Sequence, residues 1–420
     1  MNEKTHLEDL AILGGMPAFA ETLHVGRPNI GDRDVLFARI NDLLDRRWFT
    51  NNGPYVQQLE QRVADLIGAK HCIAMCNATI ALEIAIRALG LKGEVLIPSF
   101  TFVATAHSLQ WQGITPVFCD IDPISHTIDP EQVERAITSR TSGIMGVHVW
   151  GRPCNVEALA EICGRHGLKL LFDAAHAFCC THRGRMIGTF GDAEVFSFHA
   201  TKFFNTFEGG AIVTESDEVA DKARLMRNFG FAGHDNVVQL GTNGKMNEVS
   251  AAMGLTSLES LDDFIAVNHR NYQQYRKQLQ NIPGVRFLNY DENEKCNYQY
   301  IVLEIDEKAI EIKRDRLLQI LWDENVMARR YFHPGCHMME PYRSDPLYTA
   351  VKLPATEKLT RQILVLPTGT SVEEAHINAV CSIVRLAIAH GRELDARLQS
   401  AEASAVMRSA QGHVAISGDA

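Results

Sequence analysis

The sequence has no run of about 20 consecutive apolar residues, the length that a helix needs to cross a bilayer. Its first residues include acids and no apolar stretch of signal-peptide length, so we expect a cytoplasmic protein with no membrane partner. It also has no block of basic residues, because 41 Lys and Arg side chains are mixed with 51 Asp and Glu for a formal net charge of −10. This distribution argues against nucleic acid as a partner.

A disulfide framework is absent as well. The 10 cysteines are scattered, and in a reducing cytosol they are expected in the core rather than in disulfides. What is present is enough apolar material for a large core, since 46% of the 420 residues are hydrophobic. That length suits two or three domains, and one large and one smaller domain is the simplest expectation.

Short apolar runs alternate with helical patterns from about Arg27 to Asp217. This alternation predicts an α/β domain with a mostly parallel sheet covered on both faces. Helical spacing of apolar residues predicts helices at Tyr55–Ile67 and Asn155–His166, the second capped by Asn155 and ended by Gly167. Strands are expected at His71–Met75, Glu94–Ile97, Thr115–Asp120, Gly143–His148, Lys169–Phe172, Glu194–Phe198 and Gly210–Thr214.

The chain changes character after a long helical stretch around Val249–Gln280, which Pro283-Gly284 interrupts. We expect a smaller α+β domain from strands and helices at Tyr298–Ile305, Lys313–Glu324, Val326–Tyr331, Arg361–Leu366 and Val372–His390. The expected division is a large domain at 1–262 that includes the N-terminal segment, a small domain at 263–397 and a flexible tail at 398–420.

Two apolar strands lead into residues that carry charge. Leu170-Leu171-Phe172 ends on Asp173, and in open α/β sheets ligands bind beyond the carboxyl ends of the strands. The alternative is that Asp173 only caps a following helix. The next strand runs into Lys202, which Phe203-Phe204 follows. Desolvation there lowers the pKa of the amine, as Schiff-base formation with an aldehyde requires; the alternative is a lysine that reaches solvent.

A pyridoxal 5'-phosphate (PLP) site needs such an amine and acid, together with a phosphate cradle. Cys76-Asn77-Ala78-Thr79 follows a strand and opens the helix Ile80–Leu89, whose N-terminus offers backbone N–H groups and a favourable dipole to phosphate. Ordinary helix capping is the alternative for this segment. Phe102 follows the next strand, where it is placed either to stack on a pyridine ring or to lie in the core.

Three segments in this order resemble the DegT/StrS family of sugar aminotransferases: Asp173-Ala-Ala-His176, the run from Phe196 through Lys202 to Gly210, and Gly241 to Glu248. The resemblance covers about Ala11 to Arg392. It implies a PLP-dependent transferase of fold type I, working as a homodimer with active sites at the subunit interface. The sequence is most similar to members that transfer the amino group of L-glutamate to C4 of dTDP-4-keto-6-deoxy-D-glucose, a keto-deoxy sugar nucleotide, giving dTDP-4-amino-4,6-dideoxy-D-glucose and 2-oxoglutarate.

The resemblance also implies residue roles. Lys202 is the Schiff-base lysine, Asp173 is the acid on the ring nitrogen, and His176 stands near the 3-hydroxyl where the family often has glutamine. The family's Ser-Gly-Thr cradle is here Asn77-Ala78-Thr79. The other implied cofactor contacts are Ala78, Thr79, Ile80 and Ser197 at the phosphate, Phe102 against the ring, and Asn243 from the partner subunit.

The segment Arg330–His337 holds two histidines and a cysteine, but its spacing fits neither a zinc finger nor a His-Glu-x-x-His motif, so no metal is expected. The resemblance instead places this loop near the sugar nucleotide, with Tyr331 and His333 as contacts. The loop Trp48–Gly53, which includes Asn51, resembles the family's loop at the substrate mouth; a structural turn at Gly53-Pro54 is compatible with that.

Other functions are weighed against this one. PLP-dependent sugar dehydratases of the same fold replace the lysine with histidine, so Lys202 argues against them. A regulatory domain on an inherited aminotransferase fold would have lost Lys202 or Asp173 and gained a DNA-binding module, and neither is seen. Amination at C3 instead of C4, and a UDP-linked instead of a dTDP-linked sugar, stay open.

Overall fold

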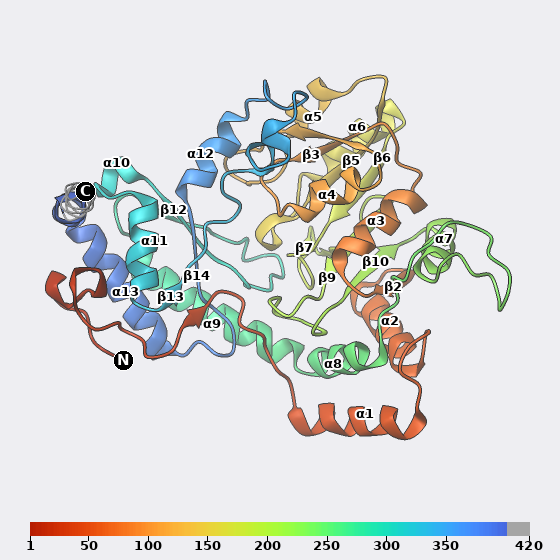
Figure 1. Ribbon diagram of the computed structural model, residues 1–420, viewed down its shortest axis with the longest axis horizontal. Coiled ribbons are helices and arrows are strands. Elements are labelled where there is room, and N and C mark those ends of the chain that lie inside the picture. The colour runs from red at the N-terminus through yellow and green to blue at the C-terminus, as the bar shows by residue number, and fades with distance from the viewer. Residues whose placement is uncertain (401–420) are drawn as a thin grey trace, which may run out of the picture.

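Apolar runs in the first two thirds of the chain form one seven-stranded sheet in the computed structural model, which describes residues 1–400 (Figure 1). The strand order is β2-β10-β9-β6-β5-β3-β4, and within this sheet only β10 runs antiparallel to its neighbours. The strands are β2 His71–Met75, β3 Glu94–Pro98, β4 Thr115–Cys119, β5 Thr141–Val147, β6 Lys169–Asp173, β9 Ala193–Ser197 and β10 Gly210–Thr214. Every strand predicted for this region is therefore confirmed, as is the mostly parallel sheet.

Helices cover both faces of the sheet, because successive side chains of a strand point to opposite sides. In β2, Ile73 and Met75 pack into one apolar cluster, while Cys72 and Ala74 pack into another on the opposite face. The first face carries α3 Ala78–Ala88, α4 Ala104–Gln110 and α7 Asp217–Arg227; the second carries α2 Pro54–Ile67, α5 Pro130–Ala136, α6 Val156–His166 and α8 Glu248–Glu259, with α1 Arg33–Arg46 packed on α8.

The predicted ends of α6 are confirmed. The side chain of Asn155 accepts a hydrogen bond from the backbone N–H of Ala158 at 3.2 Å, and Gly167 ends the helix with a φ of 64°. A left-handed residue at this place turns the chain out of the helix, which glycine does without steric cost.

The predicted helical stretch around Val249–Gln280 is confirmed, and it is divided into two helices. α8 ends at Glu259 and α9 runs over Leu261–Leu279, since Ser260 has φ −106° and ψ 11° and leaves the helical conformation. The two helices have different surroundings. α8 is buried on nearly all sides in the large unit, whereas α9 is amphipathic and continues into the C-terminal unit (Figure 1).

The C-terminal unit is built on an antiparallel sheet in the order β11-β12-β14, covered by α9, α11 and α13. Predicted strand Tyr298–Ile305 begins only at Ile301, because Tyr298 has a φ of 49°, and predicted strand Val326–Tyr331 shortens to two residues.

The elements of the C-terminal unit are β11 Val285–Phe287, β12 Ile301–Ile305, α10 Glu307–Ile310, α11 Arg314–Asp323, β13 Val326–Met327, α12 Pro354–Gln362, β14 Ile363–Leu366 and α13 Glu374–Ala389, followed by helical residues 391–400. Smaller elements are β1 Leu23–His24, which pairs with β13, the hairpin β7 Thr181–His182 and β8 Arg185–Met186, and 3-10 turns at Leu7–Asp9, Ala11–Leu13, Val149–Gly151, Cys336–Met338 and Tyr342–Ser344.

We propose a modified division of the chain. Residues Leu7 to Leu23 pack into the apolar cluster of the C-terminal unit, so the N-terminal segment goes with that unit. The division near residue 262 falls in the first turn of α9, whose Leu261 and Phe264 pack with the large unit. The predicted tail at 398–420 lies outside the described residues except for 398–400, which are helical. Within residues 1–400 no helix is both long and apolar enough to span a membrane.

Candidate active site

The carboxyl ends of β2, β5, β6 and β9 and the start of the antiparallel β10 meet at one edge of the large sheet. Asp173 is the last residue of β6 and is buried there. Its carboxylate accepts hydrogen bonds from the Thr105 hydroxyl at 2.8 Å and from the backbone N–H of Ala175 at 3.1 Å. Burial raises the pKa of Asp173, although these two bonds and the charge of Lys202 oppose the rise. No helix follows at once, so Asp173 is not a helix cap.

Lys202 lies in the loop between β9 and β10, where its side chain is partly buried. Its Nζ donates a hydrogen bond to the hydroxyl of Tyr300 at 3.3 Å. Burial lowers the pKa of Lys202 to about 8, and the negative charge of Asp173 limits the fall. The amine is therefore partly neutral near physiological pH, so the alternative of a fully solvated lysine does not hold.

A surface of backbone atoms forms where the N-terminus of α3 meets the carboxyl end of β2 and the start of β10. Asn77 caps α3 by accepting from the N–H of Ile80 at 2.9 Å, which leaves the N–H groups of Ala78 and Thr79 without a helical partner. Gly210 pairs with Ser197, and a Cβ on Gly210 would stand 2.7 Å from the nitrogen of Ala78. The predicted phosphate residues Ala78, Thr79 and Ser197 therefore come together next to Gly210, where only glycine lets the backbones approach so closely.

Ile80 and Asn243 lie beside this surface in different ways. The N–H of Ile80 is already taken by the Asn77 cap, so Ala78 and Thr79 are the better donors to a phosphate. Asn243 is exposed, and the residue after it accepts from the N–H of Cys76 at 2.8 Å, which sets the Asn243 backbone next to the cradle.

His176 is buried beside the lysine in an aromatic wall. Its ring centroid lies 4.5 Å from that of Tyr300 and 6.0 Å from that of Phe332, and it stacks on Trp150 at 6.1 Å. The backbone N–H of Trp150 donates to Nδ1 of His176 at 3.2 Å. Burial, reinforced by the positive charge of Lys202, lowers the pKa of His176 well below its usual value, so the ring is neutral.

Phe102 is 60% exposed, so its alternative placement in the core is wrong. It follows β3 at the same edge of the sheet as Asp173, where an exposed aromatic face suits stacking on a flat ligand. Tyr331 belongs to the rim of the aromatic wall, with its ring 6.2 Å from Tyr300 at a near-perpendicular angle.

The structure does not bring His333 and Asn51 into contact with these groups. His333 lies among Arg330, Arg314 and Asp315, and burial together with the two arginine charges lowers its pKa. Asn51 is exposed on the loop between α1 and α2 with a φ of 64°. Across residues 1–400, no hydrogen bond or ring contact joins either residue to Lys202 or Asp173.

Thr105, Trp150 and Tyr300 belong to the site but are not among the residues predicted from the sequence. Thr105 donates a hydrogen bond to Asp173. The only sequence feature that points to Thr105 is a second threonine, Thr101, whose hydroxyl lies 2.8 Å from the hydroxyl of Thr105. Trp150 follows a predicted strand end, which is the same signal that identifies Asp173. Tyr300 comes from the C-terminal unit, and the sequence carries no sign that this unit reaches Lys202.

Comparisons with known proteins agree with this geometry. Residues 32–385 match the DegT/DnrJ/EryC1/StrS aminotransferase family. Proteins named dTDP-4-amino-4,6-dideoxy-D-glucose transaminase are 37% identical in Shigella dysenteriae, covering 86% of this chain and 98% of the relative, and 33% identical in Escherichia coli, covering 84% and 95%. The solved structure of DesI in the presence of its TDP-sugar product is 49% identical with a TM-score of 0.90, covering 94% of this chain and 100% of that one. The predicted α/β fold of the PLP-dependent aminotransferases is thereby confirmed.

Proposed function

The chain belongs to the DegT/DnrJ/EryC1/StrS aminotransferase family, and from this premise we propose that it is a PLP-dependent enzyme that transfers the amino group of L-glutamate to C4 of dTDP-4-keto-6-deoxy-D-glucose. The observation that carries the proposal is that Lys202, whose pKa is about 8, lies within the electrostatic influence of the buried carboxylate of Asp173 at the carboxyl edge of the sheet. An ordinary surface lysine is charged at neutral pH and would be a poor nucleophile.

The residues at this edge fit PLP part by part. PLP, when bound, supplies an aldehyde for an amine and a ring that draws electrons from the bonds of the substrate carbon. Lys202 is the amine, and Asp173 is the acid that keeps a ring nitrogen protonated. The cradle of Ala78, Thr79 and Ser197 would hold the phosphate, since helix N-termini bind anions through free N–H groups. Phe102 would cover one face of the ring, and His176 would face the ring oxygen.

Lys202 would also carry protons. A group with a pKa of about 8 both accepts and releases a proton readily near pH 7 to 8, as a general acid–base residue must. Tyr300 holds the amine by its hydroxyl and thereby keeps Nζ aimed at one place when the amine is free. The same lysine would therefore take up the proton from the carbon that bears the donor's amino group and release it again within the site.

The substrate assignment rests on the relatives. Two relatives over 30% identical are named for dTDP-4-amino-4,6-dideoxy-D-glucose, and the DesI structure was solved with a TDP-sugar product. Tyr331, on the rim of the aromatic wall, is the contact that we propose for the sugar nucleotide. We also keep His333 and Asn51 as candidates that would act through loop movement or from the partner subunit.

A homodimer is part of the proposal. The loop after α7, residues 228–241, extends away from the large unit (Figure 1). Several of its apolar side chains are exposed. These are Phe229, Phe231, Val237, Val238 and Leu240, of which Leu240 is 70% exposed. Apolar groups so exposed on one segment suit burial against a second copy. Asn243 follows this loop directly, so the same contact would bring it to the partner's cradle.

The test is an absorbance titration of the purified, PLP-loaded protein. L-Glutamate should discharge the visible band of the bound cofactor, and dTDP-4-keto-6-deoxy-D-glucose should then restore it and yield a dTDP-linked 4-amino sugar by mass spectrometry and NMR. Lys202→Ala should show no such cycle. The absence of a visible band would refute the cofactor assignment. If glutamate discharges the band but only a 3-keto or UDP-linked sugar restores it, the substrate assignment alone would change.

A further inference from the structure

Trp150 adopts an unusual backbone conformation next to the site. Its φ of 63° and ψ of 7° are left-handed, a region that bulky residues avoid, and its side chain is completely buried. Strained residues of this kind persist only where surrounding structure holds them, and they gather at functional sites. The question is therefore what holds Trp150 and what its conformation achieves.

Two polar contacts and close packing hold the residue. The Trp150 carbonyl accepts from the hydroxyl of Tyr290 at 3.2 Å, and the indole Nε1–H donates to Nδ1 of His126 at 3.2 Å. The rings of Phe332 and Phe100 lie 5.8 and 5.9 Å away. Because an indole nitrogen can only donate, Nδ1 of His126 must be the unprotonated nitrogen of that ring.

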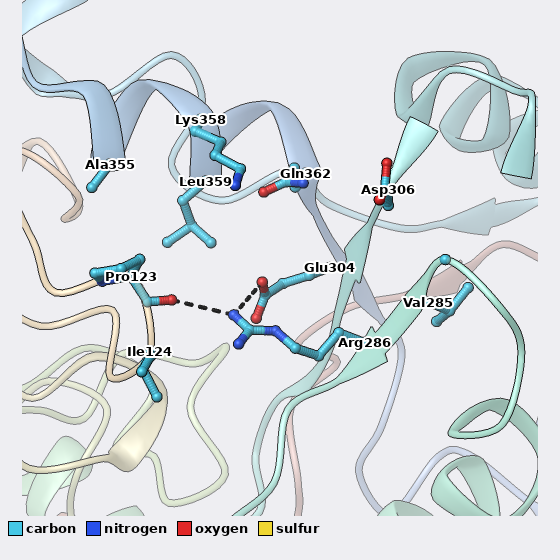
Figure 2. A pocket seen from close by; sticks show the side chains of 11 residues that line it. Pro123, Ile124, Val285, Arg286, Glu304, Asp306, Ala355, Lys358, Leu359 and Gln362 are labelled. Carbon is cyan, nitrogen blue, oxygen red and sulfur yellow. Dashed lines mark hydrogen bonds and ion pairs between the residues drawn. The ribbon is translucent and has the colours of Figure 1, made fainter. Parts of the chain in front are cut away.

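His126 is anchored in turn by a carboxylate of the C-terminal unit. Its Nε2 lies 3.1 Å from Oε1 of Glu304. The other oxygen of Glu304 pairs with Arg286, which also donates to the carbonyl of Pro123 at 3.2 Å (Figure 2). Arg286 lines a groove of about 450 Å³ between the two units. Loop residues 122–126 of the large unit are therefore clamped by two strands of the C-terminal unit.

The charges around His126 favour its neutral form. Burial lowers the pKa of His126, and the charges of Arg152 and Arg286 act in the same direction, against the influence of Glu304. Burial raises the pKa of Glu304, but the contact with His126 and the ion pair with Arg286 outweigh it and hold the pKa below its usual value. A neutral ring whose Nδ1 accepts from the indole carries its proton on Nε2, which lies 3.1 Å from Oε1 of Glu304 and 3.5 Å from a guanidinium nitrogen of Arg286.

The left-handed turn at Trp150 aims its backbone N–H at Nδ1 of His176, at 3.2 Å. A backbone N–H is always a donor, so His176 carries its single proton on Nε2. None of residues 1–400 accepts a hydrogen bond from that Nε2–H. The carbonyl of His176 is fixed separately by the side-chain amides of Asn297 at 2.9 Å and Gln299 at 2.8 Å.

We propose that Trp150, backed by His126 and Glu304, is a positioning residue that fixes His176 as an Nε2–H donor toward the ring oxygen of the cofactor. This inference rests on the proposed function, and it extends the site to a buried chain of contacts that reaches the groove between the two units. Trp150 itself touches neither substrate nor cofactor in this scheme. It acts by selecting one tautomer and one orientation of His176.

The first test is the pH midpoint of the visible band of PLP-loaded protein. A hydrogen-bond donor to the ring oxygen of PLP stabilises the negative charge of that oxygen. The nitrogen that links PLP to Lys202 then binds its proton less tightly. Trp150→Phe keeps an aromatic ring and the backbone N–H but loses the indole bond that anchors the left-handed turn. The N–H should then lose its aim at Nδ1 of His176, and the midpoint should rise by about one pH unit, a tenfold change in proton equilibrium. Trp322→Phe is the matched control, because it loses an indole bond of 2.9 Å to a carbonyl of the C-terminal unit and should leave the midpoint unchanged.

A double variant decides whether the effect passes through His176. His176→Ala should raise the midpoint at least as far as Trp150→Phe, and adding Trp150→Phe to it should produce no further change. An unchanged midpoint in Trp150→Phe, or an equal shift with and without His176, would overturn the proposal.

A second readout does not need the cofactor. In ¹⁵N-histidine-labelled protein free of PLP, the His176 signal is the one lost in His176→Ala, and it should show protonated Nε2 and bare Nδ1 throughout pH 6 to 8. Trp150→Phe should give a mixture of tautomers. If wild-type protein shows no visible band with PLP, the proposed function fails and this measurement alone judges the positioning role. A mixed tautomer in the wild type would overturn that role.

Discussion

The amine of Lys202 sets the pH at which an aldehyde can add to this site. Because only the neutral amine reacts and its pKa is about 8, the rate of PLP attachment to cofactor-free protein should rise with pH and level off above about 8. Stopped-flow absorbance of the visible band measures this rate. The ordinary lysine pKa of 10.5 predicts a rise that continues far beyond that, which would contradict the burial argument.

Asp173 makes the second half of this argument testable. Its negative charge raises the pKa of Lys202 and so opposes the effect of burial. Asp173→Asn removes that charge, so the pH midpoint of the PLP attachment rate should move to lower pH. The variant also lacks the acid on the ring nitrogen, so its transaminase turnover should be at least about a hundredfold slower. Thr105→Val keeps the carboxylate but removes one of its donors, and it should leave the midpoint near its wild-type position.

Gly210 tests the cradle with a single methyl group. A Cβ there would stand 2.7 Å from the nitrogen of Ala78 and 2.8 Å from the carbonyl of Phe196, both backbone atoms that cannot rotate away. Gly210→Ala should weaken PLP binding by at least about tenfold in a fluorescence titration. Gly164→Ala, in the interior of α6 with no atom within 4 Å of the new Cβ, should instead stabilise the protein by about 0.5–1 kcal/mol without changing PLP binding.

Single residues were predictable from the sequence where their local context decides their role. Asp173 ends one apolar strand and Lys202 follows the end of another, and in a parallel sheet those ends meet, so a pattern along the chain already implies proximity. Tyr300 and Trp150 were not predictable in this way. Their contributions depend on the C-terminal unit packing onto the sheet and on a backbone conformation that tertiary contacts impose. Phe102 shows the intermediate case, since only its exposure distinguishes stacking from core.

At the scale of elements, the N-terminus of α3 combines capping with ligand binding. Asn77 accepts from the N–H of Ile80 and so fixes the direction of the two free donors before it. Asn77→Ala should cost about 1 kcal/mol of unfolding free energy. It should also weaken PLP binding several-fold, because the cradle loses its fixed geometry.

The matched control is Asn155→Ala, which removes the equivalent cap of α6, far from the predicted phosphate residues. Urea denaturation of the cofactor-free variants should give a similar loss of stability for both, while PLP titration should show weaker binding only for Asn77→Ala. Equal PLP affinity in the two variants would mean that α3 does not hold the phosphate.

Elements were predictable where one physical signal dominates. The strands of the large sheet are continuous apolar runs because both of their faces are buried, and such runs are visible in any one sequence. The division between α8 and α9 was not predictable, because Ser260 is compatible with a helix and only the change of surroundings interrupts it. Likewise, the apolar start of predicted strand Tyr298–Ile305 gave no sign of the left-handed Tyr298.

At the scale of the whole molecule, the apolar clusters in which the two units meet include one that contains the aromatic wall of the site. Trp150 and Phe100 of the large unit pack there with Tyr300, Phe332 and Val365 of the C-terminal unit. In the proposed site, one chain supplies all the assigned residues except the phosphate contact of Asn243 and the substrate contacts of the outer loops. The arrangement of two copies in the proposed homodimer would decide these remaining roles.

Mixing two inactive variants tests that arrangement. If Asn243 serves the partner's cradle, a heterodimer of Lys202→Ala and Asn243→Ala protomers holds one site with both residues intact. At limiting PLP each variant alone should retain little cofactor or activity, whereas subunits mixed by mild denaturation and refolding should regain up to about a quarter of wild-type activity. That figure follows because half of the random dimers are heterodimers and each has one of its two sites restored.

The same mixture distinguishes the other geometry. The backbone of Asn243 lies next to Cys76 of its own chain. If Asn243 served the site of its own chain, every heterodimer would have one site without the lysine and one without the asparagine, and mixing would restore no activity. A variant with Val237→Glu and Leu240→Glu supplies the control for assembly, because two charges in the exposed apolar loop should shift the dimer toward monomer in analytical ultracentrifugation. Restoration that persists in such monomers would contradict a shared site, while its loss together with the dimer would place the exposed loop and Asn243 in one functional contact.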